Sequence, residues 1–433
     1  MEKVLVSGLN EADAGVRLEF ALARAEVAVR AVNISSAAQY AAIAAALREA
    51  REHPELYLGD TVRYVGAGRF AAGRAGADRV LADRVDFAER AAVADLAVRL
   101  HLSENTIRSQ GLRATELRRR TPSIWAAFAD GEVSVGNATV AAEFAVTLPS
   151  GAVCTAFDDA LLGPARQLPT PRFRERARRV REQLDPQTLA VRHSLARLER
   201  RVWFEADRDG MCWLGAYLPA EVGRLAMGRL DAAAASLTGR VGETRTRGQL
   251  RADIAGDLLT GAACDTTDGT PCGSVPTVSV SVAVTVPVLT LLGVSELPGT
   301  LEGYGPIDAD TARRLAGHAP SFQRILTHPI TGTLLDIDRA SYTVPADLKR
   351  WTQLRDQHCT FPGCGRAARD CDLDHTTAWQ HGGPTGAANL SHLCRHHHRL
   401  KHESNWQIDR DPDGTTTWTS PTGATHTTDP PPF

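Results

Sequence analysis

Apolar residues recur at intervals of three and four positions through most of the first 265 residues, which predicts helices. The segment 12–52 is the longest example, and its many alanines also favour a helix. A glycine-rich segment, 59–78, interrupts the pattern and is expected to be a loop, with helices resuming at about Val85. The region 1–265 is therefore predicted to be mainly α-helical.

The stretch 92–119 is predicted to form two helices separated by a short break at His101 and Leu102. Ser103 is expected to cap the second helix, 104–119, because a serine hydroxyl accepts hydrogen bonds from free amides of a first turn. This pattern resembles a helix-turn-helix, and an ordinary helical hairpin is the alternative. If the second helix enters a DNA groove, the side chains nearest the bases would be Ser103, Asn105, Arg108 and Arg113.

Valine alternates with smaller or polar residues from Val278 to Val286, and the segment 277–293 is expected to be a β-strand with one buried face. Its expected partners are the segments 200–207, 211–218 and 333–344, and 308–319 is predicted to be another helix. The region 266–345 is therefore predicted to continue the N-terminal domain with a small β element. Together these patterns predict an α+β fold class that is mainly helical.

The composition narrows the class of protein. The hydrophobic fraction of 43% and the charged fraction of 23% are typical of a globular chain, and the net charge of −2 means that any contact with nucleic acid must come from local charge. The first residues lack an apolar core of secretory type, and no uncharged apolar stretch is long enough to predict a membrane span. We expect a cytoplasmic protein, in which paired cysteines bind metal more often than they form disulfides.

Four of the eight cysteines are scattered along the chain. We expect Cys154, Cys212 and Cys264 to be small buried residues and Cys272 to be an exposed thiol in a loop.

The other cysteines lie near the C-terminus, where seven of the 14 histidines fall between residues 371 and 402. Cys359 and Cys364 stand on either side of a Pro-Gly turn, which can bring two thiolates to one ion. Cys394 precedes His397 and His398 by three and four residues, spacings that share a helix face. Two such pairs predict a closed structural zinc site, with Cys371 as a competing ligand.

The zinc site leaves Asp374, His375, Asn389 and one of the two histidines unused. Adjacent helix positions differ by about 100°, so His397 and His398 cannot both face one ion. A carboxylate and an imidazole can hold a second divalent ion in an open site, and another imidazole can accept a proton from water at neutral pH. Together these groups suit metal-assisted hydrolysis of a phosphodiester.

The motifs CTFPGC, CDLDHTTAWQHGGPT and NLSHLCRHHHRLKH resemble an HNH endonuclease of the ββα-metal type over about residues 350–405. The helical region before them resembles the domain-of-unknown-function 222 (13E12 repeat) proteins of actinobacteria. The resemblance implies a small zinc-stabilised ββα-metal HNH module at 346–405. A hairpin and a disordered tail are expected to follow at 406–433.

The resemblance also implies a role for each motif residue. His375 matches the general base, and Asn389 matches a residue that ties the active-site loop or helps to orient the base. Asp374 and His398 match ligands of a catalytic Mg²⁺ or Mn²⁺, although the run of three histidines leaves their register open. The zinc ligands that it implies are Cys359, Cys364, Cys394 and His397.

The expected module consists of a strand at 372–375, a second strand at 390–393 and a helix at 395–402. Between Lys349 and His402 there are eight Lys or Arg against four Asp, an excess that attracts phosphate. The leading hypothesis is a metal-dependent endonuclease whose partner is double-stranded DNA. One alternative is a non-catalytic, zinc-stabilised nucleic-acid-binding protein. Another is a structural or regulatory protein in which the helical region, residues 1–340, binds another protein.

Overall fold

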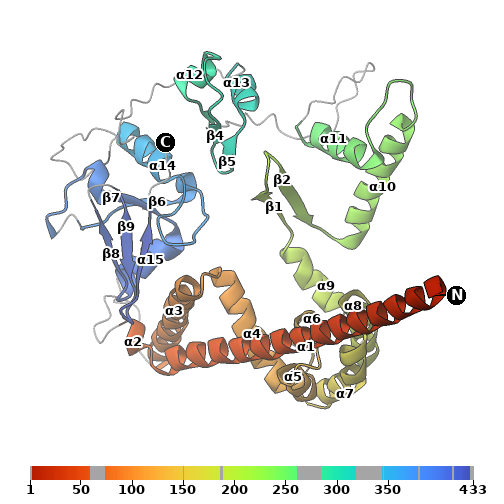
Figure 1. Ribbon diagram of the computed structural model, residues 1–433. Helices are drawn as coiled ribbons and strands as arrows, with labels where there is room; N and C mark the ends of the chain where they lie inside the picture. Colours follow the sequence, from red (N-terminus) through yellow and green to blue (C-terminus); the bar gives the residue numbers. More distant parts are fainter. Residues whose placement is uncertain are drawn as a thin grey trace. The chain divides into compact units, whose positions relative to one another are not determined.

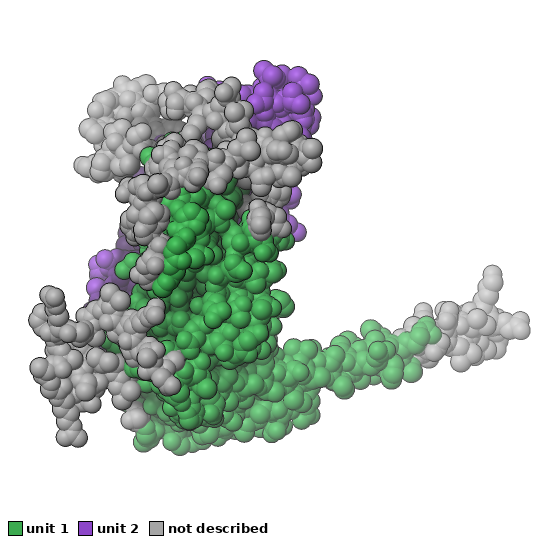
Figure 2. All heavy atoms as spheres, turned by 90° about the vertical axis from the view of Figure 1, so that its left-hand side faces the viewer, with its two compact units in different colours: residues 1–187, 323–433 green, residues 188–322 purple. Residues whose placement is uncertain are grey.

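The structure is a computed structural model that describes residues 2–58, 74–149, 151–185, 189–260, 284–317, 344, 346–378, 381–411 and 414–429. The chain divides into two compact units, which Figure 2 shows in different colours. Unit 1 comprises Met1–Gln187 and Gln323–Phe433, and unit 2 comprises Thr188–Phe322. Helices predominate in the described residues and the sheets are small and antiparallel, which confirms the predicted fold class.

The first half of unit 1 is a set of packed helices (Figure 1). Helix α1 (Glu2–Glu52) packs against α3 (Arg74–Leu100), α4 (Glu104–Arg120) and α5 (Pro122–Ala129). The remaining helices of this part are α2 (Glu55–Leu58), α6 (Val135–Ala145), α7 (Ala152–Gln167) and α8 (Thr170–Leu184). Their apolar faces enclose a core in which Leu117, Phe128, Phe157, Leu161 and Phe173 are fully buried.

The predicted break between α3 and α4 is confirmed. His101 has a φ of 54°, a left-handed conformation that ends α3, and the backbone amide of Thr106 donates to Oγ of Ser103 at 3.1 Å. The start of α3 was predicted wrongly, because the helix begins at Arg74 and not near Val85. The segment 59–73, which we expected to be a loop, lies outside the described residues.

The described residues of unit 2 form helices and two small sheets. Strands β1 (Arg201–Ala206) and β2 (Cys212–Tyr217) pair with each other, and β3 (Val284–Thr285), β4 (Gly299–Leu301) and β5 (Gly305–Ile307) form a second sheet. The strands expected at 200–207 and 211–218 are confirmed and pair with each other, whereas β3, the described end of the valine-rich segment, pairs with β4. The helices are α9 (Leu189–Leu198), α10 (Ala220–Leu237), α11 (Arg247–Thr260), α12 (Val288–Leu291) and α13 (Ala309–Gly317), and α13 confirms the prediction for 308–319.

The valine-rich segment is shorter as a strand than the pattern predicted. Residues 277–283 and the expected partner 333–343 lie outside the described residues. After β3, Pro287 caps α12 with a φ of −57°, so the chain turns into a helix where we expected a strand. Proline fixes φ near this value and lacks an amide for a sheet, which explains the change.

The scattered cysteines differ in exposure. Cys154 is buried, as expected, and its thiol donates to the Pro149 carbonyl at 2.9 Å. Cys212 is exposed, so its predicted burial was wrong. It lies in a two-stranded sheet, which is too small to bury the side chains on its faces. Cys264 and Cys272 lie outside the described residues.

The C-terminal module, described residues 346–429, begins with α14 (Ala346–Asp356). Strands β6 (Asp372–His375) and β7 (Leu390–Leu393) pair antiparallel, with Asp374 opposite Ser391, and α15 (Arg395–Glu403) packs against both. These three elements confirm the expected strand–strand–helix order. Short 3₁₀ turns occupy Ala368–Asp370 and Ala387–Asn389.

The end of the chain is more ordered than we predicted. The hairpin of β8 (Gln407–Arg410) and β9 (Thr416–Thr419) was expected, but β10 (Thr425–Thr428) adds a third strand in the expected disordered tail. Trp418 at the centre of β9 is fully buried, and its indole Nε1 donates to the Thr360 carbonyl at 3.1 Å. The sheet therefore covers the loop that carries Cys359 and Cys364.

The C-terminal module and the helices of unit 1 share one apolar cluster. Ala91, Ala94 and Val98 of α3 pack in it with side chains of the module, namely Phe361, Leu393, Leu400, Trp406 and Trp418. At its edge the Asn405 amide donates to the Tyr57 carbonyl at 2.9 Å, and the hydroxyl of Thr422 donates to Asp95 Oδ2 at 2.6 Å. Among the described residues, the structure has no helix whose length and hydrophobicity would let it span a membrane.

Candidate functional site

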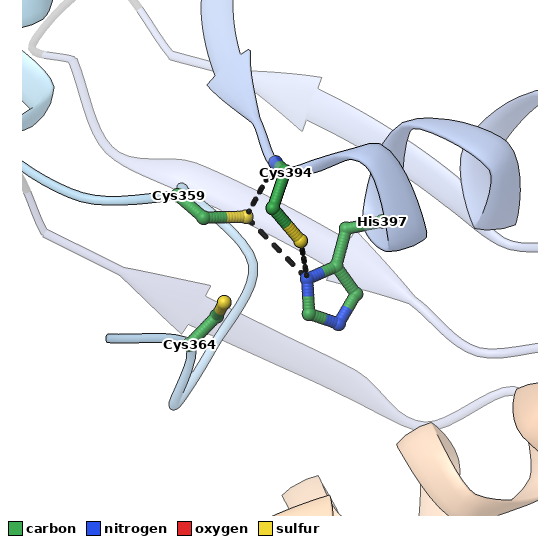
Figure 3. Close-up of side chains that lie close together, drawn as sticks. All are labelled: Cys359, Cys364, Cys394 and His397. Atoms are coloured by element: carbon green, nitrogen blue, oxygen red, sulfur yellow. Dashed lines mark hydrogen bonds between the residues drawn. The ribbon is translucent and has the colours of Figure 1, made fainter. Parts of the chain in front are cut away.

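Three cysteines and one histidine converge in the C-terminal module (Figure 3). The sulfurs of Cys359, Cys364 and Cys394 and one ring nitrogen of His397 all lie within 4.8 Å of one another. Nδ1 of His397 is 3.4 Å from the sulfur of Cys359 and 3.2 Å from that of Cys394. We call these four residues the cysteine–histidine centre.

Local structure explains how the four side chains meet. Gly363 has a φ of 77°, which glycine adopts without strain, and the resulting turn places Cys364 back beside Cys359. Cys394 is the N-cap of α15, and its backbone amide donates to the sulfur of Cys359 at 3.3 Å. His397 follows in the first turn of α15, and its ring stacks on Phe361 with centroids 3.9 Å apart.

The donor set fits a zinc ion. A tetrahedral ion about 2.0–2.3 Å from each ligand separates the ligands by about 3.3–3.8 Å, close to the distances between His397 and the two sulfurs. Three adjacent thiols cannot all ionise without a compensating cation. Accordingly, the hydrogen bond with Cys359 raises the pKa of Cys364, while those from Cys359 and Cys364 hold the pKa of Cys394 far below its ordinary value. The centre could hold a metal ion such as zinc.

Cys371, the competing ligand considered from the sequence, contacts Cys359 but is not one of the four converging residues. Its sulfur lies 3.3 Å from the carbonyl oxygen of Ala367, next to the short turn at Ala368–Asp370. The centre therefore uses the two spacings that the sequence offered, Cys359 with Cys364 and Cys394 with His397.

A second group of metal-binding side chains consists of Asp374, His398 and His402, which we call the Asp374 centre. Nε2 of His402 is 2.9 Å from Asp374 Oδ2, and Nε2 of His398 is 3.7 Å from Oδ1. Asp374 lies in β6, and the two histidines lie one turn apart on α15. We did not predict His402, although its spacing of four residues from His398 is a signal that the sequence contains.

Lys401 is the other group that contacts Asp374. Its ammonium donates to Asp374 Oδ2 at 2.7 Å and to the backbone carbonyl of His375. Burial alone would raise the pKa of Asp374, but the hydrogen bonds with His398 and His402 and the charge of Lys401 hold that pKa well below its usual range. The carboxylate is therefore ionised and already surrounded by cationic or neutral donors.

His375 is the last residue of β6 and is buried. Its Nε2 is hydrogen-bonded to the hydroxyl of Thr385 at 2.9 Å. Burial lowers the pKa of His375, the charge of Asp374 partly opposes this effect, and the charge of Lys401 adds to it. We expected His375 to converge with Asp374 and His398, but in the structure His402 completes that group. Consecutive residues of a strand point to opposite faces, which explains why the two neighbours have different partners.

Asn389 fastens the loop between the strands. Its Oδ1 accepts from the Thr377 amide at 2.8 Å, and its Nδ2 donates to the carbonyls of Thr377 and Pro384 at 3.0 and 2.9 Å. Gly383 belongs to this loop, and an added Cβ there would come within 1.9 Å of the Thr377 carbonyl oxygen. Asn389 thus shapes the loop that carries Thr385, the partner of His375.

Glu104, at the start of α4, is a residue that sequence reasoning missed. Its Oε1 lies 2.8 Å from Nε2 of His397 and its Oε2 lies 3.2 Å from Nε2 of His396. Burial would raise the pKa of Glu104, but the contacts with the two histidines hold it well below its usual range. No local signal could have shown this pairing, because 293 residues separate Glu104 from His397.

The four side chains considered for DNA contact lie along α4. Ser103 is exposed but its hydroxyl is used as the helix cap, and Arg108 pairs with Glu104 at 2.6 Å. Asn105 is exposed and Arg113 is half-buried. Contact of these residues with DNA stays a prediction.

Comparisons with known proteins assign most of the chain to a family. Residues 68–356 match the family described as Domain of unknown function (DUF222). The uncharacterized protein Rv3776 of Mycobacterium tuberculosis is 44% identical over 90 residues, which are 21% of this chain and 17% of that protein. The uncharacterized protein Rv2100 of the same species shows the same identity over 90 residues, 16% of its length.

These relatives are matched over less than a fifth of their own length. No solved structure matches the chain. The family match ends at residue 356, so the cysteine–histidine centre and the Asp374 centre lie beyond it, whereas Glu104 lies inside it. Because the match covers more than half of its residues, the chain belongs to the DUF222 family.

Proposed function

We propose that the protein is a metal-dependent endonuclease that hydrolyses phosphodiester bonds of DNA. The observation that carries the proposal is the two-sided use of α15. His397 turns to the cysteines, while His398 and His402 turn to Asp374. One short helix thus serves a closed centre and an open one. This arrangement is what the resemblance to a ββα-metal HNH nuclease implies.

The cysteine–histidine centre is proposed to hold a structural zinc ion. Three sulfurs and one nitrogen complete a tetrahedral set, so no position is left for water or substrate. The four side chains come from the loop after α14 and from the start of α15, which together flank the β6–β7 pair. Holding the two ends of this segment together keeps His398 and His402 opposite Asp374.

The Asp374 centre is proposed to hold the catalytic divalent ion. Asp374, His398 and His402 would supply three ligands and leave other positions to water and phosphate. Imidazole suits transition metals better than Mg²⁺, so this set favours Mn²⁺ over Mg²⁺. When bound, such an ion polarises a phosphate oxygen and neutralises charge that develops during hydrolysis.

His375 is proposed to accept the proton of the attacking water. Its lowered pKa keeps the imidazole neutral near pH 7, the form that can accept a proton. The hydrogen bond with Thr385 holds the ring, and Asn389 holds the loop that carries Thr385. In this role Asn389 acts through the loop backbone and does not touch the reacting atoms.

Double-stranded DNA is the proposed substrate. The excess of Lys and Arg over Asp between Lys349 and His402 favours a polyanion. Ser103, Asn105, Arg108 and Arg113 are proposed to add contacts from α4.

The test uses purified full-length protein and supercoiled plasmid with Mn²⁺ or Mg²⁺. Wild-type protein should nick or cut the plasmid, and His375→Ala should do so about 100-fold more slowly or worse. His193→Ala, the same change at an exposed position of α9, should cut like wild type. Equal rates for wild type and His375→Ala would reject His375 as the base. DNA binding without cleavage in either ion would support the non-catalytic alternative.

A further inference from the structure

His397 faces two different kinds of partner. One edge of its ring presents Nδ1 to the cysteine sulfurs, and the opposite edge carries Nε2 (Figure 3). Nε2 is 2.8 Å from the carboxylate of Glu104, which belongs to α4 in the DUF222 part of the chain. An imidazole that binds an ion through Nδ1 carries its proton on Nε2, where it can donate to this carboxylate.

Stacking alone does not fix the orientation of the ring. Phe361 lies nearly parallel to His397, with 9° between the planes, and therefore holds the plane of the imidazole. A half-turn about the Cβ–Cγ bond keeps that plane but exchanges the two edges, which moves Nδ1 away from the sulfurs. Among the described residues that contact His397, the cysteine sulfurs and Glu104 distinguish the two orientations.

Glu104 is itself held firmly. It is the first residue of α4, where the helix dipole favours a carboxylate, and Ser103 caps the helix beside it. Arg108 pairs with Oε2 from one turn along α4, and only 16% of the Glu104 side chain is exposed. The Glu104 carboxylate is therefore already in position before any ion is bound. It loses little conformational freedom when it accepts the hydrogen bond from Nε2 of His397.

We propose that Glu104 is a positioning residue of the cysteine–histidine centre, which selects the orientation of His397 and so raises the affinity of the centre for zinc. The inference rests on the proposed structural zinc. It makes the affinity of a C-terminal centre depend on a side chain of the DUF222 domain. The C-terminal module is then not a self-sufficient zinc-binding unit, in keeping with the apolar cluster that it shares with α3.

The test measures zinc affinity of the full chain by competition with a coloured chelator, for wild type, Glu104→Ala and Glu104→Gln. Glu104→Ala should bind zinc at the cysteine–histidine centre about 10- to 100-fold more weakly, at an unchanged stoichiometry. Glu104→Gln keeps an oxygen that accepts a hydrogen bond, so its zinc affinity should lie between those of wild type and Glu104→Ala. Glu89→Ala is the matched control, because Glu89 is a helical carboxylate of similar burial that pairs with Arg51 and does not contact His397.

Substitution of Co²⁺ for zinc adds a spectroscopic measurement. The visible absorption of Co²⁺ reports the ligand geometry, so its bands should shift in Glu104→Ala and remain in place in Glu89→Ala. If Glu104→Ala fails to fold, Glu104→Gln carries the test. Wild-type affinity and wild-type Co²⁺ bands in a folded Glu104 variant would overturn the positioning role. Absence of cysteine-dependent zinc from the wild-type protein would instead overturn the proposed zinc centre itself.

Discussion

The ammonium of Lys401 lies 2.7 Å from Oδ2 of Asp374, at the oxygen that also receives Nε2 of His402. The Lys401 side chain is only 10% exposed, so solvent screens its charge weakly. A divalent ion that binds Asp374 must displace this ammonium or bind beside it. Lys401 is thus a built-in competitor of the proposed catalytic ion.

Replacing Lys401 with methionine should tighten binding of Mn²⁺ by about tenfold or more, because a positive charge next to the ligand oxygen is removed. The measurement is titration of zinc-loaded protein with Mn²⁺, followed by electron paramagnetic resonance. Lys349→Met, the same change at an exposed position of α14, should leave the affinity unchanged. Equal or weaker binding of Mn²⁺ by Lys401→Met would show that Lys401 does not compete with the ion.

Replacing Cys364 with serine should abolish stoichiometric zinc binding and destabilise unit 1. Loss of an ion that binds only the folded chain should cost about 3 kcal/mol or more, on the order of 10 °C in the melting temperature. Zinc content by mass spectrometry and calorimetric melting would check both outcomes. Cys212→Ser serves as the control, because Cys212 is exposed in unit 2 and is no part of either centre. Full zinc content in Cys364→Ser would contradict the ligand set.

Asp356 should make unit 1 sensitive to acid. Burial would raise the pKa of Asp356, but the hydrogen bond with His392 and the charges of Arg355 and Arg410 hold it well below the unfolded value of about 3.9. A carboxyl group with a depressed folded pKa contributes stability above the unfolded pKa, and that stability is lost as the pH falls toward the folded pKa. The free energy of unfolding should therefore fall steeply below about pH 5.

Urea unfolding between pH 7 and pH 3 measures this effect. Asp356→Asn should be less stable than wild type at pH 7, and the difference should narrow as the pH falls. Asp370→Asn changes an exposed carboxylate of the same module and should follow the wild-type curve. This variant depends on zinc as the wild type does, so it also controls for loss of zinc at low pH. A constant difference between Asp356→Asn and wild type at every pH would refute the assigned cause.

Replacing Arg113 with alanine tests contact between α4 and DNA. If the side chain binds a phosphate, affinity should fall about five- to tenfold, and the slope of log affinity against log salt should decrease by about one. Fluorescence anisotropy at several salt concentrations would measure both. Arg166→Ala, at an exposed arginine of α7 that pairs with Glu132, is the control. Identical salt slopes for Arg113→Ala and wild type would exclude this contact.

The parts of the C-terminal module that could be predicted are those encoded by short spacings. Cys359 and Cys364 flank a turn, and Cys394 and His397 share a helix face, so local rules bring each pair together. Asp374 and His398 also meet as expected, because α15, which carries His398, packs against β6. His402 and Lys401 could have been found from the same helical periodicity.

Other features have no local signal. Glu104 meets His397 because α3 and the C-terminal module share an apolar cluster. Helix α3 contributes only Ala91, Ala94 and Val98 to it, and small side chains of this kind look the same in any helix. The threonines of β10 carry too little apolar character to predict a strand, and it forms because β9 offers a free edge with Trp418 buried beneath it. Pro287 ended the valine-rich strand where alternation alone predicted its continuation.

Helix α15 sets the phase between the two centres. His397 and His398 are adjacent, and their side chains point in directions about 100° apart because an α-helix has about 3.6 residues per turn. Inserting or deleting one residue between Cys394 and His397 would rotate everything downstream by that angle, and both centres would lose their imidazoles at once. Substitutions can therefore alter either centre alone, but an insertion or deletion at the start of α15 must alter both centres together.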